Sequence, residues 1–265
     1  MTQATRPTAL ITGGTVGIGH AFAEALAVRG YDLVLASRDE AGLQQVAEQF
    51  RDVYGVNVEV IRTDLAVRAD LLSLAERVES AHRPIDLLIN NAGFGLKTDL
   101  LELDIDLHAR ALDVMCLAPL VLSSAAGRAM KRRGHGGIIN VASSSAVITT
   151  GDYSAIKSYV QIMTEGLSIE LEGTGVKVTA LMPGWVKTEF HQRAGITAHR
   201  LPDFVWIPVD TLVAQALADW EEGKVLSVPT KPWSFAVHLA RLVPRRTIRW
   251  VSKQLMSSRK KGTDA

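Results

Sequence analysis

A glycine-rich stretch near the start of the chain constrains its fold more than any other feature. Residues 12–19 read TGGTVGIG, follow an apolar run at 9–11 and precede a helical pattern with apolar residues along one face. A glycine turn between a strand and a helix is typical of phosphate binding, because the free amides and the positive end of the helix dipole attract an anion. Glycine turns also end strands for purely structural reasons, so this stretch alone leaves the function open.

Predicted strands and helices alternate along the rest of the chain, which favours an α/β fold with helices on both faces of a parallel sheet. Asp210 is expected to cap the helix predicted at 212–222. We predict strands at 9–11, 32–36, 56–61, 85–89, 138–141, 176–181 and 225–228, and helices at 70–80, 105–133, 152–172 and 212–222 besides those that begin after the first turn and at 37–40.

Composition restricts the class of protein. With 265 residues, 47% apolar and 22% charged, the chain can bury one well-packed core. No apolar run reaches the roughly 18 residues of a membrane span, and residues 1–7 lack the apolar core of a signal peptide. Cys116 is the only cysteine, which excludes an intrachain disulfide and favours the reducing cytoplasm. A net charge of +1 gives no reason to expect nucleic-acid binding.

A second cluster consists of Tyr153 and Lys157. Residues four apart on a helix share one face, and a nearby ammonium stabilises a phenolate and lowers the pKa of tyrosine from its usual value near 10. Such a pair can act as a general acid or base, although Tyr and Lys at this spacing are also common on solvated helices. Ser143 precedes the pair, just past the strand predicted at 138–141.

Polar or glycine clusters follow the ends of most predicted strands. Besides the first turn, these are Asp64, the NNAG sequence at 90–93, Ser143 and the Pro183-Gly184 pair. In an open parallel sheet the carboxyl ends of the strands border the ligand crevice, so we expect these clusters to meet at one cleft.

In this order and spacing, the motifs resemble those of the short-chain dehydrogenase/reductase family over roughly residues 6–228. The resemblance implies a Rossmann-type doubly wound parallel sheet of about seven strands and NAD(P)-dependent oxidoreductase activity. It implies that Tyr153 passes a proton to the carbonyl oxygen and that Ser143 hydrogen-bonds the same oxygen. Lys157 would bind the nicotinamide ribose and lower the Tyr153 pKa. Because Ser144 and Ser145 are adjacent hydroxyls, the register at Ser143 stays open.

The resemblance also implies a cofactor site along the strand ends. The glycines of the first turn would approach the pyrophosphate, Asp64 and Leu65 would hold the adenine end, and Asn91 would lie by the ribose. Thr188 would touch the nicotinamide amide or the phosphates. The full implied set is Gly13, Thr15, Gly17, Ile18, Gly19, Ser37, Arg38, Asp64, Leu65, Asn91, Ala92, Gly93, Tyr153, Lys157, Pro183, Gly184, Val186 and Thr188.

The residues after the second predicted strand indicate the preferred cofactor. NAD-binding sheets place an acidic side chain there to pair with the ribose 2′-hydroxyl, whereas this chain has Ala36-Ser37-Arg38. A guanidinium suits a 2′-phosphate in both charge and geometry. We therefore predict NADP(H) in preference to NAD(H), the alternative being that Arg38 is an ordinary exposed residue at a helix start.

One position departs from the family. Met115 stands where the family usually has an Asn that helps to hold a proton-relaying water, and a thioether cannot donate a hydrogen bond. The relay is rerouted, turnover is reduced, or catalysis has been lost. A catalytically weak or inactive NADP(H)-binding sensor or scaffold is thus the alternative to an active enzyme. Sugar-nucleotide epimerase or dehydratase chemistry is a third interpretation, for which the chain has little room after the sheet.

Residues 185–207 correspond to the family's substrate-covering lid and are rich in apolar side chains such as Trp185, Phe190 and Trp206. They favour an apolar lipid-, acyl- or steroid-like carbonyl substrate, reduced to a secondary alcohol or formed from one by hydride transfer. The same side chains could instead pack against the neighbouring helix. His191 and His199 lack metal-ligand spacing, so we expect no metal site.

We expect one catalytic domain over 1–228 and a basic helical extension over 229–265. Residues 224–261 hold ten Lys and Arg and no Asp or Glu, which leaves the rest of the chain with a net charge of −9. Apolar-rich helices are predicted at 233–243 and 247–256. This tail could fold back on the body or a partner subunit, contact a membrane surface, or bind an acidic partner such as a coenzyme A thioester. The resemblance implies a homodimer or homotetramer that forms through the helices at 105–133 and 152–172, as in members of the family.

Overall fold

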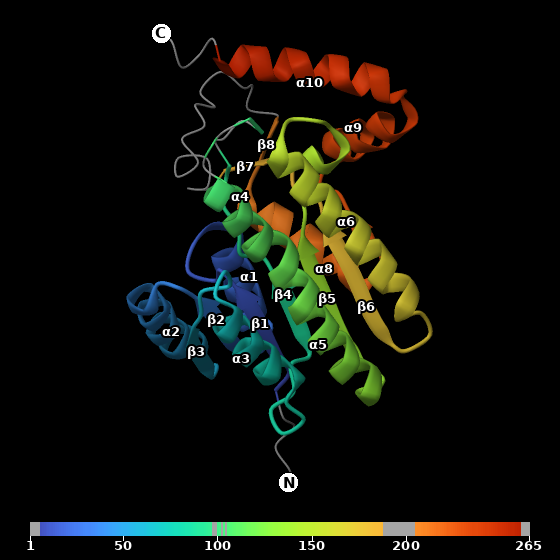
Figure 1. Ribbon diagram of the computed structural model, residues 1–265. Coiled ribbons are helices and arrows are strands. Elements are labelled where there is room, and N and C mark those ends of the chain that lie inside the picture. Colours follow the sequence, from blue (N-terminus) through green and yellow to red (C-terminus); the bar gives the residue numbers. More distant parts are fainter. Residues whose placement is uncertain (1–5, 97–99, 102, 104, 188–204, 261–265) are drawn as a thin grey trace.

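The computed structural model describes residues 6–96, 100–101, 103, 105–187 and 205–260 (Figure 1). Its main sheet has seven parallel strands in the order β3-β2-β1-β4-β5-β6-β9, and the strand order reverses between β1 and β4. The predicted doubly wound parallel sheet is therefore confirmed. The strands are β1 (Thr8–Thr12), β2 (Asp32–Ser37), β3 (Val58–Arg62), β4 (Leu87–Asn90), β5 (Gly136–Val141), β6 (Val176–Leu181) and β9 (Leu226–Ser227).

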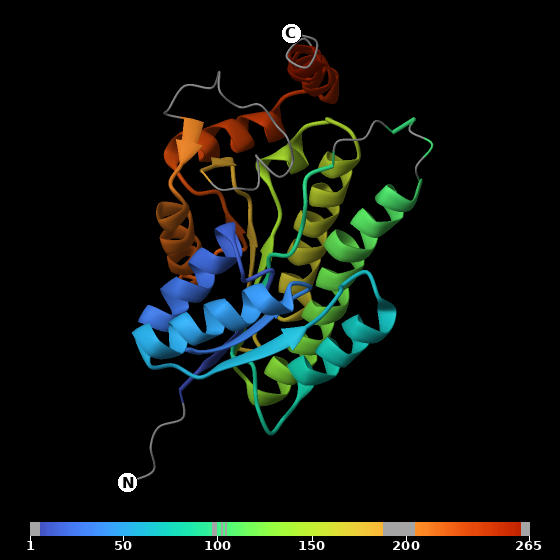
Figure 2. The same ribbon diagram turned by 90° about the vertical axis from the view of Figure 1, so that its left-hand side faces the viewer.

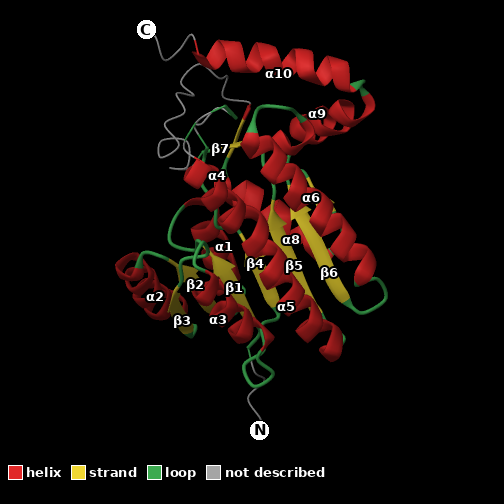
Figure 3. Ribbon diagram, viewed as in Figure 1, coloured by secondary structure: helices red, strands yellow, loops and turns green. Residues whose placement is uncertain are grey.

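Helices cover both faces of the sheet (Figures 2 and 3). They are α1 (Gly17–Val28), α2 (Glu40–Tyr54), α3 (Arg68–Glu79), α5 (Ala118–Arg133), α6 (Asp152–Glu170) and α8 (Val209–Glu221). One hydrophobic cluster joins the sheet to α1, α2 and α8, and a second joins its other face to α3, α5 and α6. Because both faces are covered, the central strands β1 and β4 are buried almost throughout.

A continuous helical stretch runs from residue 105 to residue 133, as predicted. It consists of α4 (Ile105–Leu112), a π-helical segment η1 (Asp113–Leu117) and α5. By length and composition alone this stretch could cross a membrane, but 56% of its apolar window is buried inside the fold. Ala118, Leu122 and Ala125 belong to the hydrophobic cluster that packs on the sheet. The apolar character of the stretch is thus that of a core helix.

Four buried polar side chains join the centre of the sheet to α5 and α6. The Nδ2 of Asn90 donates to the Oδ1 of Asn140 at 2.7 Å and to the Oγ of Ser123 at 3.0 Å. The Nδ2 of Asn140 donates to the Oγ1 of Thr164 at 3.0 Å. None of the four residues is more than 5% exposed, so breaking one bond would leave a polar group without water to replace it. The network therefore fixes the carboxyl ends of β4 and β5.

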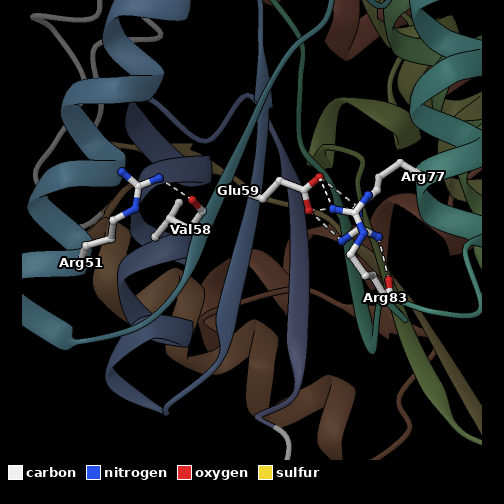
Figure 4. A network of polar contacts seen from close by, with 5 residues as sticks. All are labelled: Arg51, Val58, Glu59, Arg77 and Arg83. Atoms are coloured by element: carbon white, nitrogen blue, oxygen red, sulfur yellow. Dashed lines mark hydrogen bonds and ion pairs between the residues drawn. The ribbon is translucent and has the colours of Figure 1, made fainter.

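Ion pairs stabilise the other end of the sheet, where the strands begin. Glu59 on β3 accepts hydrogen bonds from Nε and Nη2 of Arg77 at 2.8–3.1 Å and from Arg83 at 3.2 Å (Figure 4). On the other side of the strand, Arg51 of α2 donates to the carbonyl oxygen of Val58 (Figure 4). A groove of about 1340 Å³ opens at this edge. It lies at the edge away from the glycine turn and contains none of the predicted site residues.

The segment around α8 differs from the prediction in two respects. Asp210 does not cap this helix, because the helix begins at Val209 and Pro208 occupies the N-cap position. Asp210 instead lies in the first turn, where its charge still faces the positive end of the helix dipole. The stretch before the helix contains a short unpredicted pairing of β7 (Trp185–Val186) with β8 (Trp206–Ile207).

The tail packs through α9 (Lys231–Leu242) and α10 (Arg245–Lys260) on the end of the sheet that is formed by the carboxyl ends of its strands, which we call the carboxyl edge. Val237 of α9 is buried in a cluster with Met182, which follows β6. The Oγ of Ser252 on α10 accepts a hydrogen bond from the backbone N–H of Thr149 at 2.9 Å. Of the alternatives that the sequence left open, these contacts support the tail folding back on the body.

Replacing Asn140 by alanine tests the buried network. The change leaves polar atoms of Asn90 and Thr164 without their partner, and each such loss costs about 1–3 kcal/mol. We expect the free energy of unfolding from urea denaturation to fall by about 2–4 kcal/mol. Asn57→Ala removes a hydrogen bond to Asp32 that is exposed and should cost less than about 1 kcal/mol. Equal losses in the two variants would contradict the role of the network.

Candidate active site

The glycine turn joins β1 to α1 at the carboxyl edge of the sheet. Gly13 and Gly17 have φ of +68° and +59°, the left-handed region that favours glycine. A Cβ on Gly19 would lie 2.2 Å from the carbonyl oxygen of Gly13, so no side chain fits there. Val16 occupies the N-cap position of α1, and its apolar side chain cannot accept a hydrogen bond. The first amides of α1 can therefore serve a phosphate.

Asn91, directly after β4, braces this turn. Its Nδ2 donates to the carbonyl oxygens of Thr12 at 3.0 Å and Gly13 at 3.2 Å. The Thr12 hydroxyl in turn accepts the backbone N–H of Asn91 at 3.0 Å and of Ala92 at 3.1 Å. The two motifs predicted at the ends of β1 and β4 thus hold each other in place. This bracing contact was not part of the sequence-based prediction.

Two arginines surround Asp64 beyond the end of β3. The Nη2 of Arg110 on α4 donates to both carboxylate oxygens, at 2.9 and 3.0 Å. Partial burial raises the pKa of Asp64, but hydrogen bonds from Arg110 and the Ala66 backbone, with the charges of Arg110 and Arg38, outweigh it and hold the pKa below its usual value. Arg38 is exposed at the end of β2. The sequence analysis did not identify Arg110 as a partner of Asp64, because no local pattern connects two residues so far apart in the chain.

Ser143 and Tyr153 meet beyond the end of β5. The Oγ of Ser143 accepts the backbone N–H of Ser145 at 3.1 Å, at the start of the short helix η2 (Ser144–Val147). The Ser143 side chain also lies beside Tyr153, in the first turn of α6, and acts to lower the pKa of that phenol, whereas the buried Oγ of Ser145 has no partner among the described residues. Burial raises the pKa of Tyr153 to about 12, although the Ser143 hydrogen bond lowers it.

Lys157 lies one helical turn after Tyr153 and is only 5% exposed. Its Nζ donates to the carbonyl oxygen of Val141, the last residue of β5, at 2.8 Å and lies 5.7 Å from the centre of the Tyr153 ring. Burial lowers the pKa of Lys157 to about 8. In this structure the Tyr153 pKa is raised, contrary to our expectation, because desolvation of the phenolate dominates and the ammonium lies over the ring.

Met115 and Cys116 are buried side by side in the π-helical segment, where Cys116 lies near Lys157 and Met115 near Gly93. Met115, in the π-helical segment, is 1% exposed, and a Cβ on Gly93 would lie 3.1 Å from its Sδ. The thioether therefore packs directly against the NNAG turn. Burial is the main cause that raises the pKa of the Cys116 thiol to about 11, so this cysteine stays protonated at neutral pH and is a core residue rather than a nucleophile.

An unpredicted histidine–aspartate pair lies directly before Tyr153. The Nδ1 of His108 on α4 is 2.6 Å from the Oδ2 of Asp152, the first residue of α6. Both side chains are largely buried. The pair joins two helices whose sequence positions are far apart and fixes the start of the helix that carries Tyr153 and Lys157.

The turn after β6 completes this edge of the sheet. The backbone N–H of Ser144 donates to the carbonyl oxygen of Pro183 at 2.9 Å. The indole of Trp233 on α9 packs on Gly184, where a Cβ would lie 2.1 Å from the ring. The remaining predicted residues lie on the same edge: Thr15 in the glycine turn, Ile18 at the start of α1, Ser37 at the end of β2, Leu65 after β3 and Val186 in β7. Thr188, Phe190, His191 and His199 lie outside the described residues.

The described residues thus bring two parts of a candidate active site to the carboxyl edge of the sheet. One is a glycine cradle at a helix start, suited to a dinucleotide phosphate. The other is a hydroxyl, phenol and ammonium cluster beyond the end of β5, two strands from β1, suited to proton transfer. This combination defines a dinucleotide-dependent oxidoreductase.

Comparison with known proteins agrees with this class. The sequence matches the short chain dehydrogenase family over residues 7–198. It is 36% identical over 183 residues to an uncharacterized oxidoreductase of Staphylococcus saprophyticus, an alignment that covers 68% of this chain and 78% of that protein. The chain therefore belongs to the short-chain dehydrogenase family, whose members bind NAD(P), and is an oxidoreductase.

Two solved structures are similar over most of the chain. A short-chain dehydrogenase from Sphingobium yanoikuyae in complex with NADPH has a TM-score of 0.81 and 34% identity, and the match covers 89% of this chain and 93% of that one. The bulky-bulky ketone specific alcohol dehydrogenase from Comamonas testosteroni has a TM-score of 0.78 and 28% identity, with 90% and 93% covered.

Lys157→Met tests the burial of the ammonium. The folded-state pKa of about 8 lies below the model-peptide value of 10.5, so between these pH values the unfolded chain binds more protons and stability rises with pH. From pH 7 to about 9.5, we expect the free energy of unfolding of the unchanged protein to rise by about 2 kcal/mol relative to Lys157→Met. Urea denaturation at both pH values measures this difference. Parallel pH dependence of the two proteins would contradict the lowered pKa.

Proposed function

We propose that this enzyme interconverts a ketone or oxoacyl group with a secondary alcohol by hydride transfer, using NADP(H) and an apolar lipid-, acyl- or steroid-like substrate. The observation that carries the proposal is the cluster of Ser143, Tyr153 and buried Lys157 beyond β5. It lies two strands from the glycine turn, at the same edge of the sheet. We assign residues 1–228 to the catalytic domain and residues 229–265 to an extension.

The glycine turn fits the pyrophosphate of a dinucleotide. A Cβ on Gly19 would meet the backbone of Gly13, and one on Gly13 would lie 3.1 Å from the Asn91 amide, so bare backbone lines the cradle. Asn91 and Lys157 would flank the ribose that carries the nicotinamide. Asp64 and Leu65, after β3, would hold the adenine end. When bound, the nicotinamide supplies or accepts the hydride.

Tyr153 would serve as the acid during ketone reduction. Because burial raises its pKa to about 12, the phenol holds its proton at neutral pH and can donate it to the developing alkoxide. Ser143, which lies beside the phenol, would donate its hydroxyl proton in a hydrogen bond to the same substrate oxygen. The charge on Lys157 would favour the phenolate that remains after proton transfer. In alcohol oxidation the same groups act in reverse.

The end of β2 supports a preference for NADP(H). Arg38 is exposed there, while the neighbouring Asp39 caps α2 by accepting the backbone N–H of Gly42 at 3.1 Å. The carboxylate that follows Arg38 directly is thus engaged in a helix cap, and the exposed guanidinium of Arg38 would meet a 2′-phosphate. The NADPH complex of the Sphingobium yanoikuyae enzyme is consistent with this choice.

The described part of the lid supports an apolar substrate. Trp185 and Trp206 pack edge to face with ring centres 5.7 Å apart on paired strands β7 and β8. Two indoles at this position offer a large apolar surface next to the turn after β6. The Comamonas testosteroni relative is described as specific for bulky-bulky ketones, which fits a site of this kind.

Tyr153→Phe removes the proposed acid without changing the ring. We expect kcat/KM for ketone reduction to fall by about 100-fold or more, measured as loss of NADPH absorbance with bulky and medium-chain ketones. The dissociation constant for NADPH should change less than about twofold, since the hydroxyl contributes to proton transfer rather than to cofactor binding. Tyr159→Phe, on the exposed side of the same helix, is the matched control and should keep its rate. Loss of NADPH binding together with activity would make Tyr153 structural.

Arg38→Ala tests the cofactor preference. A charge-assisted pair with a phosphate contributes about 1.5–3 kcal/mol, so we expect the dissociation constant for NADPH to rise about 10- to 100-fold. That for NADH should change less than about threefold. Fluorescence titration of both cofactors measures the two constants. Arg29→Ala, which removes an exposed arginine paired with Glu221, is the control. Equal weakening of NADH and NADPH would refute a 2′-phosphate contact.

A further inference from the structure

The two tail helices have inner faces that pack on the body and outer faces that do not. On α9, Val237 is buried, and on α10, Ile248 and Ser252 are buried. Arg241 pairs with Glu165 of α6 at 3.6 Å. These contacts place the tail over the carboxyl edge of the sheet, next to η2 and the start of α6.

The outer face of α9 is an apolar stripe. Phe235, Leu239 and Leu242 recur at helical spacing, and all three are exposed, Phe235 at 71% and Leu242 at 83%. On α10 the outward side chain is Trp250, which is 62% exposed and lies opposite the buried Ile248 and Ser252. Exposed apolar side chains gathered in this way indicate a binding surface rather than scattered surface residues.

A second apolar projection lies at the same end of the molecule. Leu101 and Leu103, between β4 and α4, are 93% and 95% exposed, and Ile105 at the start of α4 is also exposed. Both views place the start of α4 and α10 at the same end of the molecule, beyond the carboxyl ends of the strands (Figures 1 and 2). The two groups of apolar side chains therefore belong to elements at the end of the sheet that also holds the catalytic cluster.

The charge of the tail selects the partner of this surface. Arg245, Arg246 and Arg249 on α10 are exposed beside Trp250. Residues 224–261 contain ten basic and no acidic residues, while the remainder of the chain carries a net charge of −9. Two copies meeting through this face would bring like charges together, whereas an anionic lipid surface offers both negative charge and an apolar layer.

We propose that α9, α10 and the exposed side chains of Leu101 and Ile105 dock this enzyme on an anionic lipid bilayer, with the catalytic end of the sheet facing the membrane. Phe235, Leu242 and Trp250 enter the interface, and the arginines of α10 contact the headgroups. An apolar substrate could then reach the site directly from the lipid; this last clause rests on the function proposed above, but the docking itself does not.

Co-sedimentation of the full chain with vesicles tests the docking. We expect binding to vesicles of phosphatidylcholine and phosphatidylglycerol in equal amounts, little binding to phosphatidylcholine alone, and weaker binding as salt rises, because salt screens the arginine–headgroup attraction. Absence of binding to either vesicle, or equal binding to both, would overturn the proposal. The assay needs no turnover, so its outcome is independent of the Tyr153→Phe experiment.

Paired variants separate the contribution of the arginines to vesicle binding from that of the apolar side chains. Arg246→Glu with Arg249→Glu should weaken binding about tenfold or more, whereas Lys131→Glu with Arg132→Glu, the same charge change at the far end of α5, should not. Phe235→Ser with Leu242→Ser should also weaken binding, in contrast to Val28→Ser with Val53→Ser, which are similarly exposed near the opposite edge. Equal effects of variant and control would refute the surface. The proposal would also be refuted if Phe235→Ser with Leu242→Ser left vesicle binding unchanged and light scattering showed that this variant dissociates an oligomer, because the apolar stripe would then be a contact between subunits.

Discussion

Parallel pairing of β1 with β4 and of β4 with β5 is the constraint on which the rest of the structure depends. The register places Ile11 beside Ile89 and Ile89 beside Ile139, so the motifs that follow these strands come to one edge. Hydrogen bonds from Asn91 to the glycine turn and from Asn90 to Asn140 hold that register. Because a slip of one residue would reverse every side chain of a strand, these few polar contacts determine the geometry of the whole site.

Burial of the catalytic cluster follows from the same arrangement. With helices on both faces of the sheet and the tail packed over the carboxyl ends of the strands, Lys157 has little contact with water. The charge of its ammonium is stabilised by the carbonyl oxygen of Val141 and by the ring of Tyr153. Desolvation shifts the pKa values of the phenol and the ammonium in opposite directions. In this structure Tyr153 therefore keeps its proton at neutral pH and is suited to donate it.

The tail combines two properties that are usually separate. Its inner face contributes to the site, since Trp233 packs on Gly184, while its outer face carries the apolar and basic side chains. A surface that is attached so closely to the site can influence how substrate arrives without taking part in the chemistry.

The sequence by itself determined the alternation of strands and helices, because hydrophobic periodicity and glycine spacing are local properties of the chain. The order of its motifs, through their resemblance to a known family, also predicted the doubly wound sheet and the placement of the glycine turn, Ser143, Tyr153 and Lys157 at one end of that sheet. Only the tertiary structure decided which partners these groups have. Arg110 contacts Asp64, His108 contacts Asp152, and Ser252 of α10 contacts Thr149, all of them residues far apart in sequence. The raised pKa of Tyr153 belongs to the same category, since desolvation depends on everything packed around a group, which no local pattern records.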